Sequence, residues 1–497
     1  MDQDSISRRD AARLLGGAAA SPLFAASAPD ICALSAVEMA SLIRRKKLSA
    51  RDVMAAHLKQ IDRVNPQVNA IVTLVADQAM DQARKADEAQ AHGGKLGELH
   101  GIPVAIKDLF PTAGIRTTSG SRLYKDFIPD HDAIHVERLK HAGAIVVGKT
   151  NTPEFGAGSQ TFNEVFGATH NPWDLTKTCG GSSGGSAVSL TTNMVPLADG
   201  SDNGGSLRNP AAFCNIVGFR IAPGRVPFFA GTDAWSTLSV NGPMGRSVAD
   251  VALMLSVMAG PDPRCAISIT DPGSRFAGNI DAPVKGARIA WFKDFGGLPF
   301  DSRVTDAVNA QRKVFEALGC IVESAEPDLA GGDEAYATIR LWNYASSYAA
   351  DVQRHPELFK DTILESVELG SKMTGSDIAR AIALRSCVWD QMRKFQEKYD
   401  YFIVPSTQVP PFDIREPWVK EINGHRMRNY IEWMKCCWMI SVTECPSISM
   451  PCGFTPEGLP VGLQIVGRHR DELSVLKMAH AFEQATRFGA KRPALAN

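Results

Sequence analysis

The chain has 497 residues, and 53 Lys and Arg offset 54 Asp and Glu, which gives a formal net charge of −1 at pH 7. A protein that binds nucleic acid normally carries a basic excess, so this balance argues against that class. Hydrophobic residues make up 44% of the chain, enough for a large buried core and too many for a disordered protein. The body of the chain has no apolar run long enough to cross a bilayer, and we expect no membrane anchor.

The ten cysteines and eleven histidines form no metal-binding pattern. Zinc ligation needs several Cys or His at short spacing, and the sequence has no CxxC pair. Cys436 and Cys437 are adjacent, but they lie in an apolar run between Trp433 and Trp438, which is typical of a hydrophobic core. We therefore expect no metal ion. We also expect no cofactor.

The first 28 residues have the pattern of a twin-arginine export signal. Ser7, Arg8 and Arg9 precede the stretch 14–28, which is mostly small and apolar. Such a segment is an address that a receptor reads, and it does not anchor the protein. The pattern predicts a signal at 1–28, a mature domain at 29–497 and a periplasmic or exported protein. An ordinary helical extension is the alternative, and it would leave the protein in the cytoplasm.

The segment 35–93 is predicted to be helical. Ser35 and Glu38 have the spacing of a capping box ahead of the amphipathic stretch 39–45. Ser49 begins a second amphipathic stretch of the same kind.

From residue 100 onward the pattern changes to short apolar runs between helical segments. The runs 101–106 and 144–147 are predicted strands, and 133–140 is a predicted helix between them. Strand, helix and strand in this order are typical of a parallel α/β sheet with both faces covered. The segment 325–430 is charged and is predicted to be mainly helical. Further helices are predicted at 187–190, 245–258 and 472–485, and further strands at 195–198, 216–219, 287–292, 401–404, 447–450 and 462–467.

Two loops, 180–186 and 200–208, are rich in glycine and serine. Glycines let the backbone approach a ligand closely and aim several N–H groups at one point, where they bind either a phosphate or an oxyanion. Neither loop has the Gly-Lys-Ser/Thr ending of a phosphate loop. The segment 143–150 does match that pattern, but its middle is apolar and strand-like where a phosphate cradle needs an open loop. Oxyanion binding is therefore the favoured interpretation.

An oxyanion site needs a nucleophile and a base. Ser206 directly follows Gly204 and Gly205, where its hydroxyl shares a turn with donor N–H groups. No histidine stands in a motif that makes it the base. Lys107 ends the apolar run 104–106, and burial favours a neutral lysine that can act as a base near neutral pH. A lysine at a strand end that reaches back to solvent is the alternative.

Together these residues stand in segments that resemble the amidase signature family of serine amidohydrolases. The resemblance runs from about residue 33 to the C-terminus and is weakest over 325–430. It implies an α/β fold with a single large domain, a twisted mixed β-sheet covered by helices on both faces, and the helices of 35–93 packed outside. The matching segments are 101–108, 148–155, 171–173, 180–186, 200–214, 242–244 and 458–464.

The resemblance also implies catalytic roles. Lys107 looks like the family's catalytic lysine, Ser182 like the bridging serine that follows a cis peptide bond, and Ser206 like the nucleophile that becomes acylated. The implied reaction is hydrolysis of a carboxylic amide C–N bond other than a peptide bond, which releases a carboxylate and ammonia or an amine.

Further roles follow from the same resemblance. Asn203 stands where many family members have Thr, a change that a backbone donor tolerates but that alters the pocket wall. The expected oxyanion donors are the backbone N–H groups of Asn203, Gly204, Gly205 and Ser206, and the expected supporting residues are Ser183, Asp202 and Arg208.

Three alternatives stay open. The first is the glutamine-hydrolysing subunit of a tRNA-dependent amidotransferase, which would act with a partner protein. The second is an esterase or carbamate hydrolase that uses the same acyl-enzyme. The third is a non-catalytic binding module that retains the scaffold, which the presence of all three catalytic residues disfavours.

The sequence leaves the amide substrate and the oligomeric state open, although homodimers occur among relatives. We expect Phe155, Gly156 and parts of 325–440 to shape the substrate pocket. Residues that suit an apolar or aryl substituent, and equally suit the core, are Trp342, Tyr344, Trp433, Met434 and Trp438.

Overall fold

The computed structural model describes residues 30–229, 231 and 233–496. The predicted export signal at 1–28 lies outside these residues. From Ile31 onward the chain forms one compact unit. Within the described residues no helix is long and apolar enough to cross a membrane.

The core of this unit is an eleven-stranded mixed sheet, which confirms the expected α/β architecture. The pairs β2–β3, β2–β8, β11–β12 and β11–β13 are parallel, and the other neighbours are antiparallel. In order across the sheet, the strands are β1 (Ile71–Leu74), β3 (Ile145–Thr150), β2 (Pro103–Lys107), β8 (Leu197–Asp202), β10 (Val240–Gly245), β9 (Val217–Arg220), β16 (Ser447–Phe454), β17 (Pro460–Val466), β13 (Tyr401–Pro405), β11 (Arg288–Trp291) and β12 (Ile321–Ser324).

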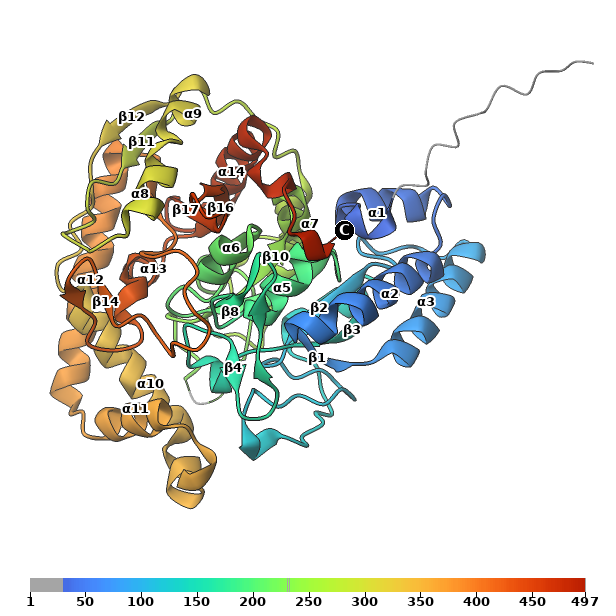
Figure 1. Cartoon of the computed structure of the whole chain (residues 1–497), viewed down its shortest axis with the longest axis horizontal. Helices are drawn as coiled ribbons and strands as arrows, with labels where there is room; N and C mark the ends of the chain where they lie inside the picture. The colour runs from blue at the N-terminus through green and yellow to red at the C-terminus, as the bar shows by residue number, and fades with distance from the viewer. Residues whose placement is uncertain (1–29, 230, 232, 497) are drawn as a thin grey trace, which may run out of the picture. The chain divides into compact units, whose positions relative to one another are not determined.

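Helices cover both faces of the sheet (Figure 1). Along β2, Val104 and Ile106 pack into one hydrophobic cluster, and Ala105 between them packs into another. Side chains alternate between the two faces of a strand, so each face has its own core. The helices are α1 (Ala36–Arg44), α2 (Ala50–Val68), α3 (Ala76–Ala91), α4 (Ile134–His141), α5 (Gly184–Thr191), α6 (Arg208–Cys214), α7 (Val248–Met258), α8 (Ser302–Asn309), α9 (Arg312–Ala317), α10 (Gly332–Arg354), α11 (Asp361–Ser371), α12 (Gly375–Lys398), α13 (Lys435–Val442) and α14 (Glu472–Thr486).

The N-terminal helices begin where their caps predict. The Ser35 hydroxyl accepts the Glu38 N–H and the Glu38 carboxylate accepts the Ser35 N–H, which is the expected capping box of α1. The Ser49 side chain caps α2 in the same position. The prediction that 35–93 is helical throughout is wrong at β1, because the four-residue run Ile71–Leu74 is too short to show a strand period and pairs with β3 at the edge of the sheet.

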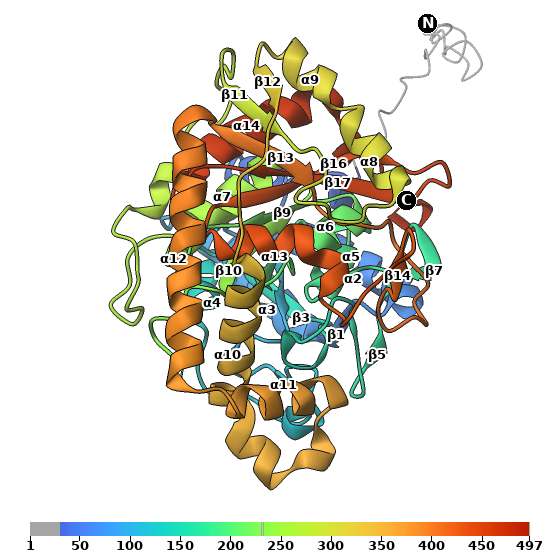
Figure 2. The same cartoon turned by 90° about the vertical axis from the view of Figure 1, so that its left-hand side faces the viewer.

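The segment 325–430 is helical only as far as α12, so the prediction that it is mainly helical holds for its first part. Helices α10, α11 and α12 lie together beside the sheet, as Figure 2 shows. From Tyr401 the chain re-enters the sheet as β13 and then runs through loops and short strands. Strand pairs outside the main sheet are β4 (Phe162–Asn163) with β5 (Gly167–Ala168), β6 (His170–Asn171) with β7 (Asp174–Thr178), and β14 (Glu421–Ile422) with β15 (His425–Arg426).

Candidate active site

Neighbouring parallel strands bring the predicted catalytic residues together. Lys107 is the last residue of β2, and β8, its parallel neighbour, runs into the second glycine–serine loop and ends at Asp202. Since parallel strands end at the same edge of a sheet, Lys107 and this loop meet there. Helix α5 begins at Gly184, within the first glycine–serine segment.

The amine of Lys107 is buried among serine hydroxyls. Its Nζ lies 2.7 Å from Ser182 Oγ, 2.9 Å from Ser183 Oγ and 2.9 Å from Ser201 Oγ. Burial lowers the pKa of Lys107 to about 7, although Asp199 and Asp202 oppose the shift. A large fraction of this lysine is therefore neutral near pH 7 and able to accept a proton.

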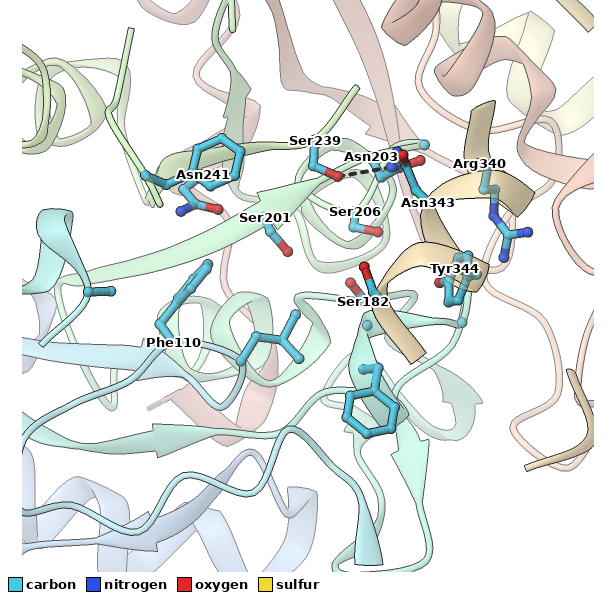
Figure 3. A pocket seen from close by; sticks show the side chains of 18 of the residues that line it. Phe110, Ser182, Ser201, Asn203, Ser206, Ser239, Asn241, Arg340, Asn343 and Tyr344 are labelled. Carbon is cyan, nitrogen blue, oxygen red and sulfur yellow. Dashed lines mark hydrogen bonds between the residues drawn. The ribbon is translucent and has the colours of Figure 1, made fainter. Parts of the chain in front are cut away.

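Ser182 and Ser206 lie at the floor of one cavity. The peptide bond between Gly181 and Ser182 is cis, as the resemblance implies. The Ser183 N–H donates to the Ser206 carbonyl at 3.3 Å, so the two loops are in direct contact. Figure 3 shows the side chains of Ser182 and Ser206 beside each other, with Ser201 on the neighbouring strand.

Three of the four expected oxyanion donors lie at the cavity. Asn203, Gly204 and Ser206 line it, and within the described part of the chain no acceptor takes their N–H groups. Gly205 differs from expectation, because its N–H donates to Asp202 Oδ1 at 2.9 Å and the residue does not line the cavity. Of the four expected donors, the other three are thus the N–H groups that have no acceptor in the described residues.

Asp202, in the second loop, is fixed by ion pairs with two buried arginines. Arg208 binds both carboxylate oxygens, at 3.0 Å through Nε and 2.9 Å through Nη2, and Arg220 binds Oδ1 at 3.1 Å. Burial raises the pKa of Asp202, but the two guanidinium groups outweigh burial and hold its pKa below the usual range. Of the expected supporting residues, Ser183 thus contacts Lys107, Asp202 contacts the backbone of the second loop, and Arg208 contacts Asp202.

Sequence reasoning missed several residues of this network. Arg220 ends the apolar strand β9 as Lys107 ends β2, so the same signal was present in the sequence. Asp199 accepts the backbone N–H of Lys107 at 2.6 Å and binds His135 Nε2 at 2.9 Å. No sequence signal distinguishes Ser201, because its contact with Lys107 depends on the pairing of β8 with β2.

Lys149 is the second buried lysine near the site, and it does not form part of a phosphate loop. It lies inside β3, and its Nζ donates to the Phe110 carbonyl, to Thr112 Oγ1 at 2.9 Å and to Thr117 Oγ1 at 3.0 Å. Burial lowers the pKa of Lys149 to about 8. The structure therefore agrees with rejecting nucleotide binding at 143–150.

The cavity above the two loops has a volume of about 820 Å³. Phe155, Gly156, Tyr344 and Met434 line it, as expected for pocket residues. The other expected candidates do not line the cavity. Trp433 stacks on Phe213, Trp438 stacks on Tyr336, and both tryptophans belong to the hydrophobic core, while Trp342 is partly exposed. In residues 30–229, 231 and 233–496, no group of three or more His, Cys, Asp and Glu is placed to hold a metal ion.

Comparison with known proteins gives the family. The Amidase family model matches residues 52–476. An acylamidase of Rhodococcus erythropolis is 36% identical over 93% of this chain and 97% of its own length. A glutamyl-tRNA(Gln) amidotransferase subunit of Moorella thermoacetica is 35% identical over 93% of this chain and 98% of its own.

Solved structures agree with the sequence relatives. A bacterial aryl acylamidase of the amidase signature family superposes with a TM-score of 0.87 and 28% identity, over 93% of this chain and 99% of that one. A 6-aminohexanoate cyclic dimer hydrolase superposes with a TM-score of 0.83 and 26% identity, over 94% and 100% of the two chains. The chain belongs to the amidase signature family and is a hydrolase of carboxylic amide C–N bonds.

Proposed function

We propose that this amidase acts on small-molecule amides without a partner protein, through an acyl-enzyme formed on Ser206. The observation that supports the proposal most directly is the contact of Lys107 Nζ with Ser182 Oγ at 2.7 Å, made by a lysine whose pKa burial lowers to about 7. Such a lysine can take a proton from serine, which a lysine of ordinary pKa cannot do near neutral pH.

This contact is the first step of the proposed proton relay. Neutral Lys107 accepts a proton from Ser182, and Ser182 accepts one from Ser206. Ser206 Oγ then attacks the amide carbonyl carbon and forms a tetrahedral intermediate. The relay runs in reverse to protonate the departing nitrogen, which is a poor leaving group otherwise. A water molecule attacks the acyl-enzyme by the same route and releases the carboxylate.

The second loop supplies the charge stabilisation. As the carbonyl oxygen becomes negative, it is bound by the N–H groups of Asn203, Gly204 and Ser206. These donors are fixed before the reaction, because Asp202 holds the backbone of the loop at Gly205 and Leu207. Fixed donors need no reorganisation as the charge develops, which is why they favour the transition state over the substrate.

The shape of the cavity favours a stand-alone amidase over a glutaminase. Phe110, Phe155, Tyr344 and Tyr348 line its walls, and Phe155 packs on Tyr348 with ring centroids 4.6 Å apart. Such walls suit an acyl or aryl group larger and less polar than the side chain of glutamine. The acyl-enzyme would also form from an ester, whose alcohol is the easier leaving group, so ester hydrolysis is expected as a side activity.

The test is hydrolysis of a panel of aryl, alkyl and primary amides and glutamine by the purified protein. We expect aryl or alkyl amides to be cleaved with release of amine, and Ser206→Ala and Lys107→Met to lose this activity. Ser386→Ala is the matched control, because its exposed hydroxyl bonds only the Ile382 carbonyl of its own helix, α12. Activity retained by Ser206→Ala would overturn the mechanism, and hydrolysis of glutamine alone would favour a role in an amidotransferase.

We also propose that residues 1–28 direct the enzyme out of the cytoplasm, on the basis of the paired Arg8 and Arg9 ahead of an apolar stretch. Cell fractionation of the full chain and of an Arg8→Lys/Arg9→Lys variant tests this. The wild type should reach the periplasm in a shortened form, and the variant should stay in the cytoplasm at full length. Equal distribution of the two would contradict the proposal.

A further inference from the structure

One wall of the cavity is a single face of helix α10. The residues of α10 that line the cavity recur every three or four positions, which is the spacing of one helix face. The N-terminal residue of this face, Tyr336, donates its hydroxyl to Asn203 Oδ1 at 3.0 Å and so ties the helix to the oxyanion loop. The cavity-lining residues of α10 are Tyr336, Arg340, Asn343, Tyr344, Ser347 and Tyr348.

Arg340 is the charged residue of this face. Its exposed fraction is 7%, yet it lines the cavity. The guanidinium lies over the Tyr344 ring at 4.6 Å and the Tyr430 ring at 5.3 Å, and it donates to the Tyr430 hydroxyl. Figure 3 shows Arg340 and Tyr344 on the same helix, with Tyr344 drawn nearer to Ser182 than Arg340 is.

No carboxylate of the described residues forms an ion pair with Arg340. The other arginine at the cavity, Arg264, is paired with Asp262 at 2.9 Å and Glu137 at 2.8 Å. Arg208 and Arg220, deep beneath the site, are both paired with Asp202. Arginine stays protonated at every pH that a protein meets, and a buried guanidinium without an anion is costly. An anion that enters the cavity would therefore give the Arg340 guanidinium the partner that the described residues do not supply.

We infer that the amide substrate carries a carboxylate, and that Arg340 binds it. The inference rests on the proposed function, because it assigns the substrate class of the same cavity. A guanidinium binds a carboxylate through two parallel N–H donors, and the stacked tyrosines hold the plane of Arg340 for that contact.

The position of Arg340 allows one substrate molecule to reach both groups. It stands four residues beyond Tyr336, which contacts the oxyanion loop, and so about one helix turn further along α10. Because Arg340 and Ser206 line the same cavity, a carboxylate at Arg340 and a carbonyl carbon at Ser206 can belong to one small molecule.

The cavity does not match an ammonium group in the same way. Among the described residues that line the cavity, only Asp132 carries a carboxylate that could bind an ammonium group. This carboxylate is already paired with Lys140 at 2.6 Å. A simple carboxylic acid amide therefore fits better than a free amino acid such as glutamine.

Matched pairs of substrates test the inference. In one pair the charge is on the acyl half, glutaric acid monoanilide against its methyl ketone 5-oxohexananilide. In the other it is on the amine half, 4-acetamidobenzoate against 4-acetylacetanilide. We expect wild type to prefer the carboxylate of at least one pair by tenfold or more in kcat/KM. The readout is release of aniline in the first pair, and of 4-aminobenzoate or 4-aminoacetophenone in the second. The pair that shows the preference tells which half of the substrate faces Arg340.

Variants of Arg340 separate charge from packing. Arg340→Met should lower kcat/KM for the carboxylate at least tenfold more than for the matching ketone, and so remove the preference, whereas Arg340→Lys should retain part of the preference. Arg354→Gln, an exposed arginine of the same helix, is the control and should behave as wild type. Equal losses on charged and neutral substrates would show a structural role and overturn the inference.

Binding gives a readout that does not depend on turnover or on the Arg340 variants. By calorimetry, Ser206→Ala should bind the carboxylate of the preferred pair at least tenfold more tightly than the ketone. Equal binding of the two would overturn the inference even if wild type hydrolyses both. Preferential binding of the carboxylate without any hydrolysis by wild type would instead contradict the proposed function.

Discussion

The floor of the cavity and its wall on α10 differ in whether their charged groups have partners. By the floor we mean the cavity-lining residues Ser182, Ser201 and Ser206 together with the groups buried beneath them. At the floor, Asp202 is bound by Arg208 and Arg220, and the Lys107 amine contacts three serine hydroxyls. On the α10 wall, the Arg340 guanidinium rests on tyrosine rings and has no carboxylate partner in the described residues. Because the charged groups of the floor are paired with one another, their positions are fixed before substrate binds. The Arg340 guanidinium of the wall is instead available to pair with a charged group of the substrate. We infer that the floor determines the reaction and the wall determines which amide undergoes it.

The largest effect is expected from two serines at the floor that both contact Lys107. Ser182 and Ser201 lie 2.7 Å and 2.9 Å from its Nζ. If only Ser182 passes the proton, Ser182→Ala should lower kcat by roughly 10⁴-fold or more, as loss of a residue in a catalytic triad does. Ser201→Ala should lower kcat by less than about tenfold, because one hydrogen bond to the lysine is lost. Similar losses in steady-state kinetics would show that the hydroxyls around Lys107 are interchangeable.

The next effect concerns stability rather than turnover. Asp202→Asn leaves Arg208 and Arg220 buried with no anion, and breaking such a pair lowers the free energy of unfolding by about 3–5 kcal/mol. Urea denaturation followed by circular dichroism measures the loss. Asp413→Asn is the control, since its pair with Arg415 lies at the surface and should be dispensable. A stable Asp202→Asn protein would mean that the floor is not held by charge.

The pH dependence separates the two buried lysines. Because the pKa of Lys107 is lowered to about 7 and the neutral amine is the active form, kcat/KM should fall as pH drops below about 7, approaching tenfold per pH unit. Lys149, with a pKa lowered to about 8, contacts no catalytic group, so Lys149→Met should keep the same acid limb. If the acid limb moves in Lys149→Met, the titrating group is Lys149 and the assignment to Lys107 is wrong.

The smallest effect is expected at the aromatic wall. Phe155 packs between Tyr348 and Phe359, and it lines the cavity. Phe155→Ala should raise KM for aryl amides by about tenfold through lost apolar contact, while kcat for a small primary amide changes little. The small primary amide is the control substrate, because it does not reach the aromatic wall. A fall in kcat for both would mean that the wall also positions the catalytic floor.

The sequence predicted the floor better than the wall for a physical reason. Lys107, Ser182 and Ser206 lie in short motifs where glycines and strand ends limit the backbone to few conformations. Gly205 shows the limit of this reasoning, since its N–H binds Asp202 and only the folded loop reveals that. Arg340 lies in a long charged helix, where nothing in the sequence distinguishes a cavity residue from a surface one. The export signal stays a prediction.

The most direct test of the proposed mechanism is the site of the covalent intermediate. The protein is mixed with an aryl amide, quenched in acid within the first turnovers, and measured by intact mass and peptide mapping. The mechanism predicts an added acyl mass on the peptide that contains Ser206, absent in Ser206→Ala and present in Ser201→Ala. An acyl group on Ser182, or turnover by Ser206→Ala at the wild-type rate, would contradict it.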